Sequence, residues 1–459
     1  MSKFRYSATI MQHASKASIH VRRIAVVALL ISAGVMVWLV ARGLKVGTQP
    51  HVDFFDFYYA SQAVPKGLDI YAVGDPGYIY PPLLAFLMQP LAWLEPVFAA
   101  QIWVGVNAIL AAALCWLCVD TATRLLGVRW HWSKITLACC VVFWILADGF
   151  RNELEWGNCN FLIMLGVVLG IRWLHLKPAL AGACLAVAAA LKYLPILFLL
   201  YLIARGNWRS AASMCVVLVA LLLMPALQVG WHRNVEFLGS SVRGVSTMLA
   251  SKVADPARFK DSLIDQSAPT APANIWPMDA DFSFSIPSGI ARVVRDTHAP
   301  KWAVACAILS VAALCIAICA AIYRRNRQRL WWFFASVPKR TPAWLVTAEA
   351  IGVSTAMVVF SPQAQKRHFN MLIPLIALAV VLAIAAPTRV RAWTVVGLVI
   401  LAILATPMIN TPWTRDFFVN QWEWFGGPSY AILACQFITL AMAFAYFRVH
   451  VVDKLAHES

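Results

Sequence analysis

Twelve apolar stretches, separated by short polar segments, dominate the pattern of hydrophobic and polar positions along the chain. They lie near residues 24–43, 98–119, 135–148, 159–174, 179–191, 193–204, 210–229, 302–323, 343–360, 370–386, 392–408 and 430–447. Spans of a bilayer need about 20 apolar residues, and lipid leaves backbone groups no partner outside the segment, so runs of this kind form helices. The pattern predicts an all-α polytopic membrane protein with about twelve transmembrane helices.

Composition and charge agree with this fold class. Hydrophobic residues make up 61% of the 459 positions and charged residues only 13%, whereas soluble proteins carry about a quarter charged residues. With a cytoplasmic N-terminus, the inner loops and tails hold most of the Lys and Arg and few acids, while the outer loops are nearly neutral. The net charge of +17 therefore reports topology and contact with anionic lipid, and we expect no nucleic-acid partner.

The same pattern divides the chain into a cytoplasmic basic tail (1–23), a single transmembrane domain (24–447) and a second cytoplasmic tail (448–459). The transmembrane domain is predicted to contain three outer loops, at about residues 44–97, 230–301 and 409–429. The stretch YPPLLAFLMQPLAWL in the first loop is amphipathic and predicts one or two helices at the outer membrane surface. Residues 261–277 of the second loop are rich in Pro, Ala, Ser and Thr and predict an irregular lid.

Acidic and aromatic residues cluster just after the first apolar stretch, in HVDFFDFYYAS. Asp53 and Asp56 share one face if this segment is helical. Two neighbouring carboxylates at a low-dielectric surface raise each other's pKa, and burial does the same, which suits a general base. Alternatively, either acid caps the helix or pairs with an outer cation.

Cationic residues recur at two other places that the topology puts on the outer side. Lys366, Arg367 and His368 join two spans, and Lys192 interrupts an apolar hairpin. Charges at membrane depth are costly and point to function, and such donors would stabilise a bound or departing phosphate. The alternative for each lysine is a structural side chain that reaches toward the membrane surface.

A third polar segment, RNELEWGNCNF, links the third and fourth spans on the outer side. Polar contacts suited to a sugar are offered by Arg151, Glu153, Glu155, Asn158 and Asn160, and Trp156 offers a stacking face. An ordinary solvated loop fits the same residues. The chain contains no P-loop, dinucleotide fingerprint or HExxH motif, and its histidines lack ligand spacing. We therefore expect no metal and no soluble cofactor, and a donor that already resides in the membrane.

Taken in order, these motifs resemble the GT-C glycosyltransferases of family 87, the polyprenol-phosphate-mannose-dependent mannosyltransferases. The family pattern D-F-x-x-[FY]-Y-x-A…G-x-x-x-Y, followed by YPP, is matched by Asp53, Phe54, Phe57, Tyr58, Ala60, Gly67, Tyr71, Tyr80, Pro81 and Pro82. The family's G-Q-x-N and A-L-K-x-x-P are matched by Gly157, Asn158, Cys159, Asn160, Ala190, Leu191, Lys192 and Pro195.

The late family motif S-P-x-S-W-x-H-H is met only in part. Ser361, Pro362 and His368 match, Arg367 stands where the family has its first histidine, and the Ser-Trp pair is absent. The resemblance covers roughly residues 50–375 in collinear order. The departures leave the expected GT-C-like fold unchanged and bear on the donor pocket.

The resemblance implies that a hexose, expected to be mannose, moves from a polyprenyl-phosphate sugar to a hydroxyl of a lipid or glycan acceptor. Asp53 is then the general base and Asp56 an auxiliary acid or acceptor contact. Lys192, Lys366, Arg367 and His368 bind the donor phosphate. The remaining candidates contact the sugar or acceptor: Tyr58, Tyr80, Arg151, Asn158 and Asn160.

A single base without a covalent intermediate implies inversion. The expected location is the inner (plasma) membrane, with the site on its outer, periplasmic side. Two other functions remain open at the level of sequence. One is a transporter or flippase for a lipid-linked or polar solute, in which Pro-broken helices and Lys192 line a pathway. The other is an outer-face ligase that takes a glycan from a polyprenyl diphosphate.

Overall fold

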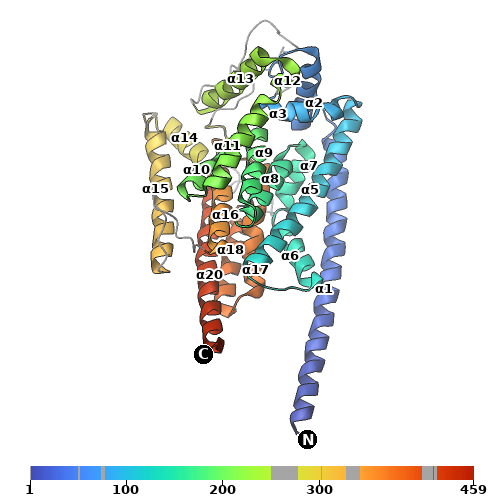
Figure 1. Cartoon of the computed structure of the whole chain (residues 1–459), viewed down its shortest axis with the longest axis vertical. Coiled ribbons are helices and arrows are strands. Elements are labelled where there is room, and N and C mark those ends of the chain that lie inside the picture. The colour runs from blue at the N-terminus through green and yellow to red at the C-terminus, as the bar shows by residue number, and fades with distance from the viewer. Residues whose placement is uncertain are drawn as a thin grey trace.

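The computed structural model describes residues 2–49, 52–73, 78–249, 278–300, 302–326, 342–405, 417 and 421–458. Within these residues the regular secondary structure is entirely helical (Figure 1). The prediction of an all-α polytopic membrane protein is thereby confirmed. The predicted lid at residues 261–277 lies outside the described residues.

Each of the twelve predicted spans coincides with a helix or pair of helices. The helices are α1 (Ser2–Val46), α5 (Pro96–Leu125), α6 (Trp132–Ile145), α8 (Asn160–Trp173), α9 (Pro178–Leu191), α10 (Leu197–Ala204), α11 (Trp208–Leu223), α15 (Trp302–Arg325), α16 (Ala343–Val359), α17 (Ile373–Ala385), α18 (Thr388–Leu404) and α20 (Gly427–Glu458). Length separates them into two groups. Among the described residues, six segments are long and apolar enough to cross a membrane. The number twelve stays a prediction.

The other apolar helices are short or broken. After α6 the chain bends by 67° into α7 (Ala147–Trp156), and counting this pair as one span raises six to seven. Helices α8 and α9 have 14 residues each. The close packing of α8 against α9 depends on small residues, because a Cβ on Gly166 would lie 2.8 Å from the carbonyl oxygen of Cys184. Small residues at such contacts are typical of membrane helices.

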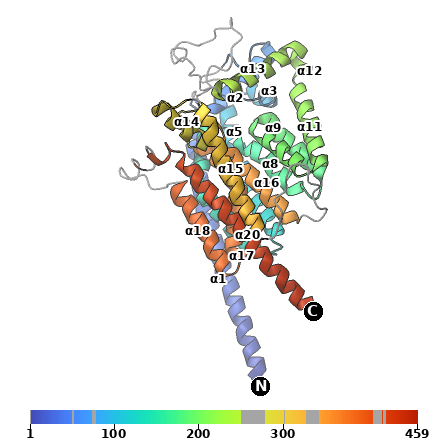
Figure 2. The same ribbon diagram turned by 90° about the vertical axis from the view of Figure 1, so that its left-hand side faces the viewer.

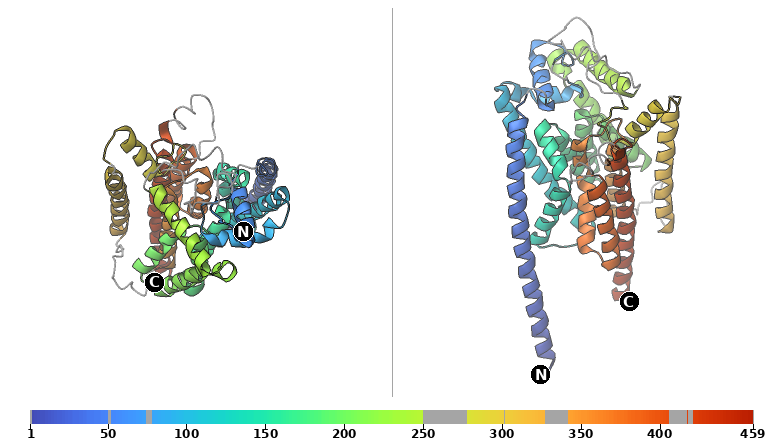
Figure 3. Two further views of the ribbon diagram at one scale, coloured as in Figure 1. Left: turned by 90° about the horizontal axis from the view of Figure 1, so that it is seen from above. Right: turned by 180° about the vertical axis from the view of Figure 1, so that it is seen from behind.

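Both ends of the chain lie at one end of the molecule. The first turns of α1 and the last turns of α20 point the same way, away from α2 (Asp53–Ala63) and α13 (Trp231–Leu249) (Figures 1 and 3). This arrangement agrees with the even number of crossings that the charge pattern requires. We call the end with α2 the outer end and the opposite end the inner end, as the charge bias predicts.

Short helices cover the outer end. The amphipathic stretch predicted to form surface helices contains α3 (Pro82–Leu87) and α4 (Gln89–Ala92), and the second outer loop contains α12 (Ala226–Val229), α13 and α14 (Ile286–Asp296). Three 3₁₀ turns add to them: η1 (Val64–Lys66), η2 (Leu194–Ile196) and η4 (Lys366–Leu372).

Helix α14 is anchored by a buried arginine. Arg292 is fully buried and donates to the backbone carbonyls of Ala280 (2.5 Å), Ser283 (2.7 Å) and Trp424 (2.8 Å). Ser288 in the same helix donates to the carbonyl of Pro362 at 3.0 Å. The helix therefore braces the loop that leads into η4.

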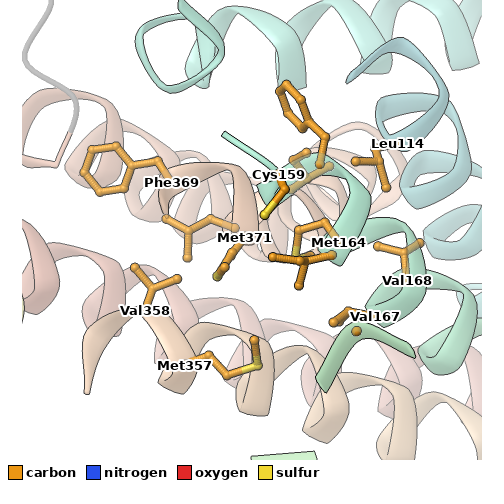
Figure 4. Packing of buried hydrophobic residues seen from close by; sticks show 14 of the residues in the cluster. Leu114, Cys159, Met164, Val167, Val168, Met357, Val358, Phe369 and Met371 are labelled. Atoms are coloured by element: carbon orange, nitrogen blue, oxygen red, sulfur yellow. The ribbon is translucent and has the colours of Figure 1, made fainter. Parts of the chain in front are cut away.

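Helix α15 stands at the edge of the bundle and packs against α14 and α20, whereas α17, α18 and α20 lie side by side (Figure 2). The core lies inside the bundle directly below the outer end. Cys159, Met164, Met357, Phe369 and Met371 are buried against one another there (Figure 4). These side chains form the apolar floor beneath the polar residues described next.

Candidate active site

Asp53 is the first residue of α2, and two side chains contact one of its carboxylate oxygens. Oδ2 accepts a hydrogen bond from Nδ2 of Asn158 and lies 3.0 Å from a guanidinium nitrogen of Arg367. The side chain is 13% exposed. Among the described residues, neither of these contacts involves Oδ1.

The segment that carries Asn158 fits tightly against α2. Gly157 adopts a left-handed backbone conformation (φ 60°), and a Cβ there would lie 2.7 Å from the Cβ of Phe54. The indole of Trp103 donates to the carbonyl of Gly157 at 2.7 Å. The left-handed backbone and the close approach to Phe54 both require a glycine at position 157. The close approach brings Asn158 to Asp53 across 105 residues of sequence.

The amide of Asn158 also reaches Tyr80. The Tyr80 hydroxyl lies 3.0 Å from Nδ2 and 3.3 Å from Oδ1 of Asn158. Because Oδ1 also accepts from the backbone N–H of Cys159 at 2.7 Å, Nδ2 is the atom that faces Asp53. Burial raises the pKa of Tyr80 well above 10, and the neighbouring Cys159 and Asp53 add to the rise. The phenol therefore stays a neutral hydrogen-bonding group.

Lys192 ends α9 and turns its amine toward the same place. Nζ lies 3.1 Å from Oδ1 of Asn160, 3.0 Å from Nε2 of His368 and 5.4 Å from the centre of the Tyr80 ring. Burial lowers the pKa of Lys192. In the described part of the chain no carboxylate oxygen lies within ion-pair distance of Nζ. The amine is thus surrounded by neutral groups.

His368 and Arg367 come from η4, between α16 and α17. Nδ1 of His368 accepts the backbone N–H of Gln365 at 2.9 Å, which directs Nε2 toward Lys192. The guanidinium of Arg367 lies 5.3 Å above the ring of Trp156, and its Nε is buried without a hydrogen-bond partner in the described structure. The stacking face predicted for Trp156 is therefore occupied by an arginine.

Two further residues join this group: Glu153, predicted only as a polar contact for a sugar, and Asn370, which sequence reasoning did not select. Glu153 accepts hydrogen bonds from Asn160, and Asn370 donates to Glu153 at 3.3 Å. For Asn370 the signal available was an asparagine at the start of an apolar span. We call the connected set the outer network, and it consists of Asp53, Tyr80, Glu153, Asn158, Asn160, Lys192, Arg367, His368 and Asn370.

Four predicted site residues are placed elsewhere. Tyr58 donates to the carbonyl of Leu94 at 2.7 Å, which fastens α2 to the segment after α4. Lys366 lies 3.6 Å from Glu423, whose pKa is raised by burial. Arg151 pairs with Asp148 within α7.

Asp56 is the fourth of these residues. It lies one turn beyond Asp53 in α2 and is buried, with 5% of its surface exposed. It takes part in an interaction of its own and is not a free acid. Its predicted role as an auxiliary acid stays a prediction.

The outer network places the carboxylate of Asp53 beside the guanidinium of Arg367, and the amine of Lys192 beside the imidazole of His368. Because Nδ1 of His368 accepts a hydrogen bond, this imidazole is neutral. Such a set can accept a proton at Asp53 and stabilise negative charge near Lys192, His368 and Arg367. Among the described residues, His, Cys, Asp and Glu form no group of three that could hold a metal ion.

Comparisons with known proteins identify the class to which this chain belongs. The sequence model of glycosyltransferase family 87 matches residues 78–348, more than half of the chain. A polyprenol-phosphate-mannose-dependent α-(1-2)-phosphatidylinositol mannoside mannosyltransferase of Mycolicibacterium smegmatis is 25% identical over 94% of this chain and 91% of its own length. An α-(1→3)-arabinofuranosyltransferase of the same organism is 30% identical over 34% of this chain and 37% of its own length.

Among solved structures, ArnT from Cupriavidus metallidurans bound to undecaprenyl phosphate aligns with 94% of this chain and 78% of its own. The identity is 13% and the TM-score 0.34, a similarity too low to support any conclusion about this chain. The family match, the relatives and the helical bundle together answer the question of class. This chain is a membrane glycosyltransferase and belongs to glycosyltransferase family 87.

Proposed function

We propose that this protein transfers a hexose from a polyprenyl-phosphate sugar to an acceptor hydroxyl at the outer end of the bundle. One observation carries the proposal: Asp53, Lys192 and His368, which lie far apart in sequence, meet in the outer network. A carboxylate that can remove a proton lies beside cations that can hold a phosphate. Family membership disfavours the transporter alternative, since it identifies a glycosyltransferase.

Asp53 is the proposed general base. Arg367 and Asn158 hold Oδ2, so the carboxylate cannot rotate freely and Oδ1 is presented to an incoming hydroxyl. Oδ1 removes the hydroxyl proton as the acceptor oxygen attacks the anomeric carbon. The bond from that carbon to the phosphate oxygen breaks, and its electron pair leaves with the polyprenyl phosphate. A single displacement of this kind inverts the anomeric configuration, by the logic that applies to inverting glycosidases.

Lys192, His368 and Arg367 are the proposed phosphate ligands. Lys192 has no carboxylate partner among the described residues, and a buried amine of this kind gains most from an arriving anion. Preorganised donors aimed at the leaving oxygen typically contribute about 10²–10³ in rate each. We do not include Lys366 in this set, because its ammonium pairs with the carboxylate of Glu423 at 3.6 Å.

The proposed sugar is mannose. Support comes from relatives named as polyprenol-phosphate-mannose-dependent mannosyltransferases, one of which aligns over almost the whole chain. Arabinofuranose is the second candidate, because a relative with 30% identity is named for that sugar. The proposed acceptor is a lipid or glycan hydroxyl. The proposed location is the plasma membrane, with the outer network on the periplasmic side.

The test uses purified protein and synthetic polyprenyl-phosphate donors that carry labelled mannose, glucose or arabinofuranose, together with a mannosyl polyprenyl diphosphate. A membrane extract supplies the acceptors, and labelled product is separated by chromatography. We expect transfer from the mannosyl monophosphate at least about tenfold faster than from the other donors, equivalent to about 1.4 kcal/mol of discrimination. Preferred use of the diphosphate would favour the ligase alternative, and no transfer from any monophosphate would reject the proposal.

A further inference from the structure

Glu153 is a fully buried acid within the outer network. It lies in α7, its side chain is fully buried, and its nearest partners are amides rather than cations. In the described part of the chain no Lys or Arg nitrogen lies within 4 Å of its carboxylate. A buried carboxylate without a direct cation is expensive to maintain. A specific role would account for the presence of an acid at this buried position.

The carboxylate of Glu153 fixes the orientation of Asn160. Oε1 accepts the backbone N–H of Asn160 at 2.6 Å, and Oε2 accepts the side-chain Nδ2 of the same residue at 2.9 Å. Both nitrogens of Asn160 face Glu153, so the side-chain Oδ1 points the other way. That oxygen is the atom 3.1 Å from Nζ of Lys192. Without Glu153 the amide could flip and present an N–H to the amine.

A second arm connects Glu153 to the segment that carries His368. Nδ2 of Asn370 donates to Oε2 of Glu153 at 3.3 Å and to the carbonyl of Gly149 at 3.4 Å. A Cβ on Gly149 would lie 3.0 Å from Oδ1 of Asn370 and 3.3 Å from the carbonyl of Lys366, so α7 and η4 are in direct contact. His368 precedes Asn370 by two residues and faces Lys192 from this segment.

From this geometry we propose that Glu153 is a positioning residue for the donor phosphate site. Through Asn160 it orients the amine of Lys192, and through Asn370 it holds the segment of His368. The positions of these two phosphate ligands therefore depend on one buried carboxylate. The inference rests on the proposed function. It assigns no contact between Glu153 and substrate.

A purely structural acid offers a direct contrast in the same molecule. Glu349 in α16 is similarly buried but pairs with Arg205 at 2.9 Å and accepts from the hydroxyls of Tyr201 and Tyr323. Its partners lie far from η4 in the fold. Glu349→Gln is therefore the matched control: it removes one buried negative charge while leaving the outer network unchanged.

The test measures the dissociation constant of sugar-free polyprenyl phosphate for purified full-length protein in detergent, with thermal unfolding recorded alongside. Glu153→Gln keeps the shape but presents an N–H to a donor of Asn160, and we expect binding to weaken about tenfold, about 1.4 kcal/mol. Glu153→Asp keeps both carboxylate oxygens as acceptors on a side chain one methylene shorter. It should bind to within about threefold of the wild type, about 0.7 kcal/mol.

Glu349→Gln should lower the unfolding temperature without changing the dissociation constant. An unchanged dissociation constant in Glu153→Gln, or a Glu153→Asp variant that binds no better than Glu153→Gln, overturns the positioning role. If Glu153→Gln does not fold, Asn370→Ala removes the second arm alone and should weaken binding about threefold; unchanged binding there also counts against the role.

The outcomes separate the two proposals. If the wild type binds and Lys192→Ala does not, while Glu153→Gln binds normally, only the inference about Glu153 fails. If the wild type does not bind polyprenyl phosphate, the proposed donor and the inference fail together.

Discussion

The two ends of the bundle each bury charged residues, but they do so differently. At the inner end, Arg205 and Glu349 form an ion pair that Tyr201 and Tyr323 complete, and we call these four residues the inner cluster. At the outer end, Lys192 faces an amide oxygen, an imidazole and a phenol ring, with no carboxylate within ion-pair distance among the described residues.

The difference shows at which end the buried charges are matched by the chain's own residues. The inner cluster has one acid matched by one base, so it links α10, α15 and α16 and requires nothing from outside. In the outer network Arg367 contacts Asp53, but the buried amine of Lys192 has no direct carboxylate partner among the described residues. An anionic ligand would stabilise this arrangement. We therefore regard the inner cluster as structural and the outer network as the place where a phosphate binds.

Among the variants that test this comparison, Asp53→Asn should reduce sugar transfer most. The amide has almost the same shape but cannot remove a proton, and general bases typically contribute about 10²–10⁴ in rate. We expect kcat for sugar transfer to fall about 10³-fold while the KM for the polyprenyl-phosphate donor changes little. Initial-rate measurements of labelled transfer give both constants.

Asp56→Asn is the control for that variant, because it removes a neighbouring carboxylate from the same helix. It should retain kcat within about fivefold. A loss as large as that of Asp53→Asn would mean that the two acids act together, and full activity of Asp53→Asn would remove Asp53 from the role of base.

Lys192→Ala should give the next largest loss of sugar transfer. Loss of a charged hydrogen-bond donor to the phosphate is worth about 1.5–3 kcal/mol, which corresponds to about a 10–100-fold fall in kcat/KM for the donor. Lys366→Ala serves as its control, because that ammonium contacts Glu423 and not the outer network. Equal losses in both variants, measured with the same donor, would contradict the assignment of Lys192.

Arg367→His restores the residue expected from the family pattern and makes the charge at this position depend on pH. Histidine has an ordinary pKa of about 6.5, whereas arginine is charged at every accessible pH. If a positive charge at 367 assists transfer, the rate of the variant relative to wild type should fall severalfold as pH rises from about 5.5 to 7.5, because the imidazole loses its proton. Arg151→His, on the same outer side, should give a ratio that does not vary with pH; a flat ratio for Arg367→His would show that its charge is not needed.

Glu349→Ala should have the smallest effect on transfer and a large effect on stability. Breaking a buried ion pair on one side leaves Arg205 uncompensated and costs about 3–5 kcal/mol. We expect a lower unfolding temperature in detergent and an unchanged donor KM at temperatures where the variant is folded. A changed donor KM would indicate that the two ends of the bundle are coupled.

Much of the fold was predictable, because hydropathy depends on each segment alone. All twelve apolar stretches are helical, and the surface helices expected in YPPLLAFLMQPLAWL are α3 and α4. The bend of 67° between α6 and α7 was not predictable from composition. Just past the bend, Gly149 packs against Asn370 and Lys366, which lie more than 200 residues later in the chain.

The site was predictable by residue type but not by pairing. The sequence singled out Asp53, Lys192 and His368 as unusual charges, and the structure brings them together. It could not show that Asn158 and Arg367 hold Asp53, since those contacts join segments more than 100 residues apart. Tyr58 was selected as a sugar contact because of its neighbours in sequence, yet successive residues of a helix point in different directions, and its hydroxyl faces Leu94.

The central claim is that the lipid phosphate binds at the outer network, and photocrosslinking tests it most directly. A polyprenyl phosphate with a photoreactive diazirine next to the phosphate is irradiated with the purified protein, and the labelled peptides are identified by mass spectrometry. We predict labels on the segments around Asp53, Asn158, Lys192 and His368 that excess unlabelled polyprenyl phosphate suppresses. Labels concentrated around Arg205 and Glu349, or spread evenly over the lipid-facing helices, would contradict the claim.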